Sequence, residues 1–319
     1  MPSKNQSVAL KIFRSIPIFQ STAKTIVTIG TFDGVHLGHQ KIIQKLVTQA
    51  IETNCQSLIL TFFPHPRMVL QKDSEIKLLN TMIEKSDLLE EFGIDLLIIH
   101  PFDKAFSDLS AEDFVLEVLI KKLNIRKIII GHDHRFGHNR SANINDLIAF
   151  GHKYNFEVEQ ILAEQIEEVS ISSTKIRKAL NRGNVDLANQ YLGYPYQLSG
   201  QVVRGKQLGR TIGFPTANID VDKDYKLIPQ SGVYVVQSKI NNIRVFGMMN
   251  IGTNPTVGGG LQKVEVYFFD FDQDLYGKNI TVGLLTRLRH EQKFSGIEAL
   301  KLQLQTDKNQ SVSFISNLK

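Results

Sequence analysis

The hydrophobic pattern of the chain changes at Tyr194-Pro195-Tyr196, and this change constrains the fold more than any other feature. Before it, short apolar runs alternate with helical stretches, which is typical of a parallel sheet covered by helices. After it, short apolar runs follow one another with Gly, Pro and Asn turns between them, which is typical of an antiparallel barrel or sandwich. We predict an α/β domain over residues 1–182 and a β domain over residues 183–319, which begins with a helical stretch that ends near Leu192-Gly193.

Apolar runs expected to be strands of the first domain cover residues 26–29, 57–63, 94–100, 126–131 and 156–162. Helices are expected over 40–50, 81–92 and 110–123, and from Ser172 onward. Several histidines follow strand ends, namely His36, His65 and His132. Because ligands of parallel sheets bind beyond the carboxyl ends of the strands, we expect these histidines to share one site.

The stretch Thr28–His39, TIGTFDGVHLGH, joins the first strand to a helix. Its glycines allow backbone N–H groups and a helix N-terminus to face an anion. The candidate phosphate-binding residues are Gly30, Phe32, Asp33, Gly34 and Gly38, and the candidate catalytic residues are His36 and His39. A tight turn whose histidines cap the helix or pair with loop carbonyls is the simpler alternative, and the glycine spacing is neither a Walker A loop nor GxGxxG.

Two later segments of this domain are suited to phosphate or base contacts. Gly131–Asn143 is a polar, cationic loop after a strand, and a solvated loop is an equally good interpretation. Its three histidines match no common zinc spacing. The hydroxyls of Ser172, Ser173 and Thr174 begin a helix with Arg177 one turn later, so they either cap the helix or hold phosphate.

Strands of the second domain are expected over 196–203, 232–239, 244–251, 264–269 and 279–288, with a closing helix over 298–305. The loop GKQLGRTIGFPTAN precedes the second of these strands and is suited to cradling phosphate. Its candidate phosphate-binding residues are Gly205, Lys206, Gly209, Arg210, Gly213 and Pro215. The oxygens of Thr216 and Asn218 are hard ligands suited to Mg²⁺, although a hairpin loop is the simpler alternative.

Glu265 alternates with apolar neighbours on the expected strand over 264–269. Such a carboxylate faces either solvent or a site, where it could act as a general base. The following D-x-D-x-D run, which begins at Asp270, lacks the glycine and glutamate positions of a calcium loop, so we expect a turn.

The composition of the 319 residues, 42% apolar and 22% charged, is ordinary for a globular protein. No apolar run is long enough to span a bilayer, and the N-terminal residues lack the features of a signal peptide. The lone Cys55 fits a reducing cytoplasm, and the net charge of +5 comes without a basic, aromatic-rich cluster. We therefore expect a cytoplasmic protein that binds neither nucleic acid nor a membrane.

The motifs GTFDGVHLGH, TFFPHP, GHDHRFG and ISSTKIR resemble, in this order, those of the HxGH nucleotidyltransferase half of the bacterial bifunctional riboflavin kinase/FMN adenylyltransferases. GFPTAN, FGMMNIGTNPTVGG, VEVYFFDFDQDLYG and LRHEQKF resemble their riboflavin kinase half. The resemblance covers nearly the whole chain. It implies a Rossmann-like adenylyltransferase domain followed by a β-barrel kinase domain, with ATP, riboflavin, FMN and FAD as partners and Mg²⁺ as cofactor.

In the first domain, the resemblance implies that His36 and His39 stabilise ATP phosphates and that Ser173, Thr174 and Arg177 hold the departing pyrophosphate. Residues implied to line the nucleotide and flavin sites are Pro64, His65, Asp133, Arg135 and Phe136. This chain departs from the family pattern at His134, Ser141-Ala142 and Asn143.

In the second domain, the resemblance implies that Thr216 and Asn218 bind Mg²⁺–ATP and that Glu265 takes the proton from the ribityl hydroxyl. Asn250 and Arg289 are implied to contact the flavin, and His290 stands where proline is usual.

Two other functions fit parts of the sequence. One is an HxGH nucleotidyltransferase with another acceptor, of the pantetheine or glycerol-phosphate type, which the second domain disfavours. The other is a non-catalytic flavin-binding or regulatory protein, which the intact candidate residues disfavour. The sequence leaves the oligomeric state open, and a weak homo-oligomer is one alternative.

Overall fold

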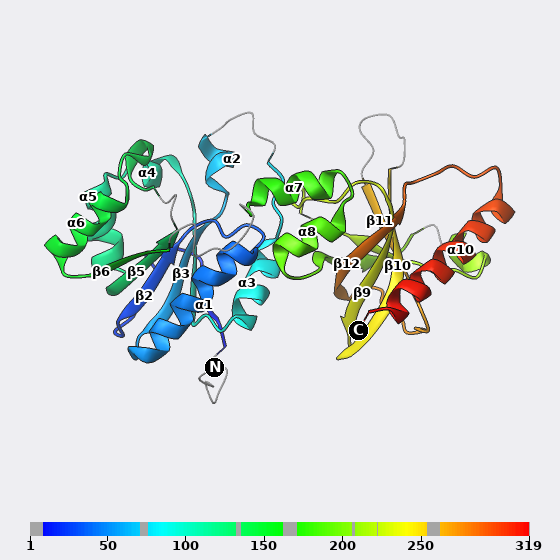
Figure 1. Cartoon of the computed structure of the whole chain (residues 1–319), viewed down its shortest axis with the longest axis horizontal. Helices are drawn as coiled ribbons and strands as arrows, with labels where there is room; N and C mark the ends of the chain where they lie inside the picture. The colour runs from blue at the N-terminus through cyan, green and yellow to red at the C-terminus, as the bar shows by residue number, and fades with distance from the viewer. Residues whose placement is uncertain are drawn as a thin grey trace. The chain divides into compact units, whose positions relative to one another are not determined.

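The computed structural model describes residues 9–70, 76–131, 135–161, 171–205, 208–221, 223–253 and 262–318. The chain forms two compact units, the first made of Met1–Ile76 and Met82–Ile171 and the second of Lys77–Thr81 and Ser172–Lys319. No helix of the described residues is both long enough and apolar enough to cross a membrane. Figure 1 labels most of the elements of both units.

The first unit is built on a six-stranded parallel sheet of order β1-β4-β3-β2-β5-β6. The strands are β1 (Lys11–Phe13), β2 (Thr25–Ile29), β3 (Gln56–Phe62), β4 (Leu96–His100), β5 (Ile125–Gly131) and β6 (Glu157–Ile161). The predicted parallel α/β fold is confirmed, and β1 is an additional short edge strand. Its three residues are too few to show a periodic apolar pattern.

The helices of this unit are α1 (Leu37–Glu52), α2 (Pro66–Leu70), α3 (Met82–Glu91), α4 (Lys104–Ser107), α5 (Ala111–Asp113) and α6 (Ile144–Tyr154). A 3₁₀ turn, η2 (His138–Arg140), precedes α6. The predicted helix over 110–123 begins with Ser110 as its N-cap, but it continues as the π-helix η1 (Phe114–Ile120). Its wider turns are closed by hydrogen bonds such as Lys121 N to Leu116 O.

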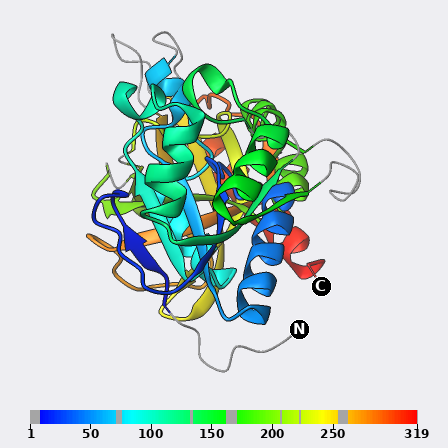
Figure 2. The same ribbon diagram turned by 90° about the vertical axis from the view of Figure 1, so that its left-hand side faces the viewer.

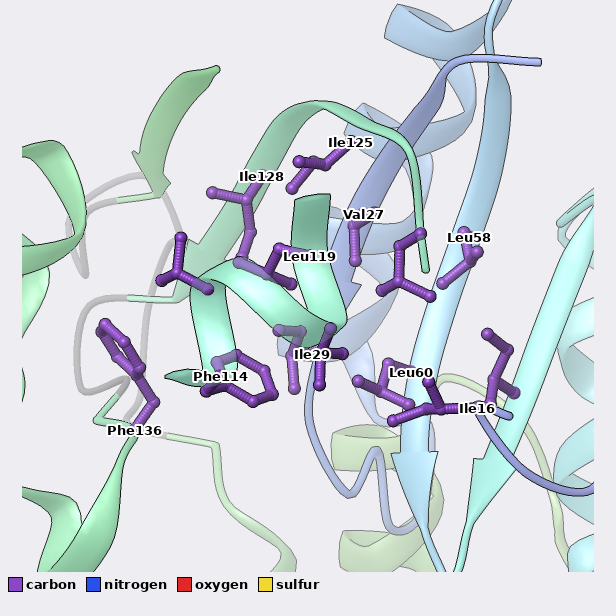
Figure 3. Close-up of a cluster of buried hydrophobic side chains, with 14 of the residues drawn as sticks. Ile16, Val27, Ile29, Leu58, Leu60, Phe114, Leu119, Ile125, Ile128 and Phe136 are labelled. Carbon is purple, nitrogen blue, oxygen red and sulfur yellow. The ribbon is translucent and has the colours of Figure 1, made fainter. Parts of the chain in front are cut away.

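One core of this unit lies between η1 and the sheet. Alternate residues of the strands, such as Val27, Leu58 and Ile128, pack there against Phe114 and Leu119 (Figure 3). The strand residues between them face the other side, where α1 packs on β2, β3 and β5; α1 is the blue helix in Figure 2. The sheet is therefore buried on both faces, and its carboxyl edge is the place left for ligands.

The second unit is a closed antiparallel barrel of order β10-β11-β8-β7-β12-β9. Its strands are β7 (Tyr196–Val203), β8 (Ala217–Asp220), β9 (Gly232–Ile240), β10 (Ile243–Thr253), β11 (Gln262–Phe268) and β12 (Asn279–Arg289). The predicted barrel is confirmed, and β8 was not expected as a strand. Its sequence, ANID, is short and polar, so only pairing with β11 and β7 makes it a strand.

The helices of the second unit are α7 (Ser173–Asn181), α8 (Val185–Leu192), α9 (Leu208–Thr211) and α10 (Ile297–Ser316). Helix α10 is longer than expected and lies along the outside of the barrel, against β10 and β12 (Figure 1). Residues 77–81, from the first half of the sequence, also belong to this unit. Leu78 pairs with Lys226, whose buried Nζ donates to Leu79 O at 2.7 Å.

Candidate active sites

The loop between β2 and α1 lies where the sheet changes direction. From β2 the chain proceeds to β3 and β4 on one side, whereas β5 and β6 lie on the other. In open α/β sheets, the crevice at the carboxyl ends of the strands at such a point is the usual ligand site. The sequence prediction for Thr28–His39 therefore falls on the position that the topology favours.

His36 and His39 lie against each other at the start of α1. Their rings are stacked, with centroids 3.6 Å apart and an interplanar angle of 17°. His36 occupies the N-cap position but makes no side-chain capping hydrogen bond, so the capping alternative does not describe it. Among the described residues, neither Nδ1 atom has a hydrogen-bond partner, although both are buried.

Both imidazoles are uncharged at neutral pH. Burial lowers the pKa of His36 to about 4, although the nearby Asp33 acts in the opposite direction. The pKa of His39 is lowered well below its ordinary value by burial, and the neighbouring His36 and Lys85 add to this effect. A neutral imidazole has one donor and one acceptor nitrogen, so each ring can still donate one hydrogen bond to a phosphate oxygen.

The loop before the histidines has an unusual backbone. Phe32, Gly34 and Val35 have φ angles of 45°, 85° and 34°. Only glycine adopts such angles readily, so a branched residue such as Val35 must be held there by its surroundings. The Gln40 side chain provides part of this support by donating to Val35 O at 2.9 Å.

Lys85, which no sequence motif marked, lies beneath this loop. It projects from α3, is 2% exposed, and its Nζ donates to Thr31 O at 2.6 Å. Burial lowers the pKa of Lys85 to about 8, while the charge of Asp33 acts to raise it. A lysine among helix-forming residues is ordinary in sequence, so only the fold reveals its burial.

Other predicted residues of the first unit differ in their surroundings. Pro64 and His65 follow β3; Pro64 is exposed, and the half-buried His65 accepts a hydrogen bond from Arg67 N through Nδ1. Arg135 is exposed, whereas Phe136 is buried and packs with Phe114 in the core. Asp133, together with His132 and His134, lies outside the described residues.

Three polar residues predicted for the second site are neighbours across adjacent strands. Asn218 on β8 pairs with Glu265 on β11, and Glu265 pairs with Asn250 on β10. Directly paired residues present their side chains on the same face of a sheet. Val264 and Val266 are buried on the opposite face, so the half-buried Glu265 lies on the outer face of the barrel.

Two glycines of the loop before β8 lie close to other atoms of the loop and of β8. A Cβ atom on Gly205 would lie 2.3 Å from Asn218 Nδ2. At Gly209 it would lie 2.2 Å from Phe214 O and 3.7 Å from Thr216 Oγ1. Gly213 has a φ of 84°, and Arg210 and Pro215 are exposed. Lys206 lies outside the described residues.

Arg289 has a partner that the sequence did not predict. Its guanidinium binds Asp307 of α10 through two nitrogens, with Nε–Oδ1 at 2.9 Å and Nη2–Oδ2 at 2.7 Å. Asp307 is fully buried and also accepts from Gln303 Nε2 at 2.9 Å. Arg289 therefore fixes α10 on the barrel, and its contact with a flavin stays a prediction.

Ser173, Thr174 and Arg177 lie on α7, within the second unit. The capping alternative is confirmed for Ser172, which is the N-cap of the helix and whose hydroxyl accepts from Lys175 N at 3.3 Å. Arg177 Nε donates to Lys77 O at 2.8 Å.

The donors at the barrel site fit magnesium. The Asn218 amide fills the space above Gly205, and its amide oxygen and the Thr216 hydroxyl are hard donors. Among the described residues, no group of three or more His, Cys, Asp or Glu side chains is arranged to hold a metal. Two such donors suit an ion that keeps several waters and is held mainly by nucleotide phosphates.

Comparison with known proteins agrees with both halves. The FAD synthetase family model matches residues 18–175, and the riboflavin kinase family model matches residues 192–315. A solved structure described as a macrolide-efflux protein from Streptococcus pneumoniae superposes with a TM-score of 0.86 at 31% identity, covering 95% of this chain and 99% of that one.

Curated relatives match along nearly their whole length. The bifunctional riboflavin kinase/FMN adenylyltransferase of Buchnera aphidicola subsp. Acyrthosiphon pisum is 38% identical over 93% of this chain and 96% of its own. That of Escherichia coli strain K12 is also 38% identical, over 88% of this chain and 90% of its own. The chain therefore belongs to the family of bifunctional riboflavin kinase/FMN adenylyltransferases.

Proposed function

We propose that the chain makes FAD from riboflavin in two steps at two separate sites. The barrel unit transfers the γ-phosphoryl group of ATP to riboflavin and yields FMN. The α/β unit then joins FMN to the adenylyl group of a second ATP and releases pyrophosphate. The observation that carries the proposal is the alignment of Asn218, Glu265 and Asn250 on three adjacent barrel strands, in a chain that also bears the paired histidines.

In the kinase step, Glu265 is the general base. Its carboxylate accepts the proton of the ribityl 5′-hydroxyl as the oxygen attacks the γ-phosphorus, and ADP leaves. Its place on the outer barrel face, beside Asn218, supports this role. Asn250, on the other side of Glu265, is proposed to contact the flavin.

Thr216 and Asn218 would hold the magnesium ion of the kinase site. When bound, that ion supplies positive charge to the phosphates of ATP. The glycine-rich segment at Gly205 and Gly209 leaves room for these side chains and is proposed to receive the phosphates with its backbone N–H groups. Lys206, Arg210, Gly213 and Pro215 are proposed to bind the phosphates on the composition of this glycine-rich, cationic loop.

In the adenylylation step, a phosphate oxygen of FMN attacks the α-phosphorus of ATP, and the bond to pyrophosphate breaks. His36 and His39 each donate a hydrogen bond to the phosphates, and the N-terminus of α1 adds its dipole. The burial that keeps the rings neutral supports this role, as do the Nδ1 atoms, which have no hydrogen-bond partner in the described part of the chain. No covalent enzyme intermediate is needed, because positioning and charge stabilisation provide the rate.

The remaining assignments of the adenylylation site rest on the resemblance. They give Pro64, His65, Asp133, Arg135 and Phe136 to the nucleotide and flavin, and Ser173, Thr174 and Arg177 to pyrophosphate. The domain boundary at residue 182, the cytoplasmic location and the lack of nucleic-acid and membrane partners are likewise proposals. They are supported by the motif positions and the composition.

A chromatographic time course of riboflavin, FMN and FAD with Mg–ATP tests the proposal. FMN should appear first and then FAD, with one pyrophosphate released per FAD. Formation of FMN without FAD would contradict the adenylylation step. A riboflavin-retaining protein that makes neither product would favour the non-catalytic alternative.

A further inference from the structure

Lys85 is a buried cation with a specific acceptor. A lysine is almost never fully buried unless its ammonium is paired, because removing the charge from water is costly. Here the side chain is 2% exposed and reaches Thr31 O, a backbone atom of the loop that leads to the histidines. The same carbonyl accepts from Thr61 Oγ1 at 3.2 Å, so two side chains from two different elements converge on one atom.

The carbonyl of Thr31 lies at the start of the strained turn. The next residue, Phe32, already has a positive φ, and Gly34 and Val35 follow. The Phe32 ring contacts His39, with centroids 5.0 Å apart, and His39 in turn stacks on His36. A movement of Thr31 would therefore pass through Phe32 directly to the two imidazoles.

Charge gives a second reason for a cation here. Asp33 is 1% exposed within the same turn, and its charge acts on Lys85 and on His36. Since both histidines are neutral, they do not compensate this carboxylate. The ammonium of Lys85 offsets it within the protein.

We propose that Lys85 is a positioning residue for FMN adenylylation, whose ammonium holds the Thr31–Val35 turn in the conformation that presents His36 and His39 to the nucleotide. It acts through the loop and does not touch the substrates. This inference rests on the proposed adenylylation activity of the first unit.

The decisive variant is Lys85→Met, which keeps the length of the side chain but removes the charge and the donor. A displacement of catalytic groups by about 1 Å can cost about 100-fold in rate, so kcat for FAD formation from FMN should fall by about that factor. The KM for ATP should change much less. The riboflavin kinase activity of the same protein is the internal control, and Lys104→Met, at an exposed lysine paired with Asp108, is the matched variant.

Chemical rescue separates a positioning role from packing alone. Lys85→Ala lacks three carbons and the nitrogen, which propylammonium supplies. Added propylammonium should raise the adenylylation kcat of Lys85→Ala by at least about tenfold, a partial return of the positioning effect. Tetramethylammonium, which has no N–H donor, should not. If Lys85 acted by packing alone, the Lys85→Met enzyme would keep the kcat of the wild type, because methionine fills most of the same space.

A folded Lys85→Met enzyme with the adenylylation kcat of the wild type would overturn the proposal, as would a folded Lys85→Ala enzyme that ignores propylammonium. If neither lysine variant folds, Lys85→Gln, which removes the charge of the ammonium, takes their place. A fall in its adenylylation kcat supports the proposal, and an unchanged kcat rejects it. A wild-type protein that makes FMN but no FAD would instead reject the adenylylation activity itself, and this inference with it.

Discussion

At the scale of single residues, burial decides the chemistry of the histidines. His36 is 7% exposed, and its pKa falls to about 4 because a buried charge is poorly solvated. A neutral ring can donate to a phosphate oxygen without a change of charge when ATP binds. The same burial makes the first unit sensitive to acid.

We predict that this unit loses stability as the pH falls from 6.5 towards 4. The folded pKa of His36 lies below the ordinary value of 6.5, so the unfolded chain binds the proton first and acid favours unfolding. For His36 alone, the shift corresponds to about 3 kcal/mol. Denaturant unfolding of wild type and His36→Asn across this range measures it. The variant should lose less stability on acidification, and equal losses would show that His36 does not contribute.

At this scale the sequence was informative where residues form a motif. The spacing of His36 and His39 and the PTAN tetrapeptide identified residues that the fold brings together. Lys85 and Asp307 were not found, because a lysine or an aspartate in a polar helix carries no local signal. Their roles depend on burial and on partners distant in sequence, Thr31 and Arg289.

At the scale of elements, α10 is fixed to the barrel by one buried ion pair. Arg289 ends β12 and binds Asp307 through two nitrogens, and Arg289 pairs across the sheet with Val233, which in turn pairs with Asn250. The ion pair thus connects α10 to the cross-strand neighbours of Glu265. Apolar contacts of Leu304 and Ile315 with the cluster around Met248 complete the packing.

We predict that Asp307→Asn destabilises the second unit by about 3–5 kcal/mol, because it leaves the guanidinium of the partly buried Arg289 without its counter-charge. The riboflavin kinase activity should fall, while FAD formation from supplied FMN should persist. Denaturant unfolding measures the stability, with Glu298→Gln, at an exposed residue of the same helix, as the control. A loss below about 1 kcal/mol, the value of a surface pair, would contradict this role.

Short and irregular elements were the ones that sequence patterns missed. Strand β8 has four residues and becomes a strand through pairing on both sides, and η1 forms within an expected α-helix. The longer elements, such as β5 and β9, were found because their apolar runs are continuous. Pairing with its two neighbouring strands therefore accounts for β8.

At the scale of the whole molecule, the two compact units are not continuous in the sequence. Residues 77–81 lie early in the sequence but belong to the barrel unit, where Lys226 Nζ donates to Leu79 O. The two compact units divide between Ile171 and Ser172, whereas the domain boundary predicted from the sequence is at residue 182. A pattern of apolar runs cannot reveal that a segment from the first half of the sequence belongs to the second unit, because the pattern reports only local structure.

The most direct test of two sites with separate tasks uses the paired variants Glu265→Gln and His36→Ala. Each is followed by chromatography with Mg–ATP and either riboflavin or FMN. Glu265→Gln should lose at least about 100-fold in FMN formation, the size of a general-base contribution, and still convert supplied FMN to FAD. His36→Ala should accumulate FMN and form little FAD. A folded Glu265→Gln protein in which both activities fall together, or a His36→Ala protein with unchanged FAD synthesis, would contradict the division of tasks.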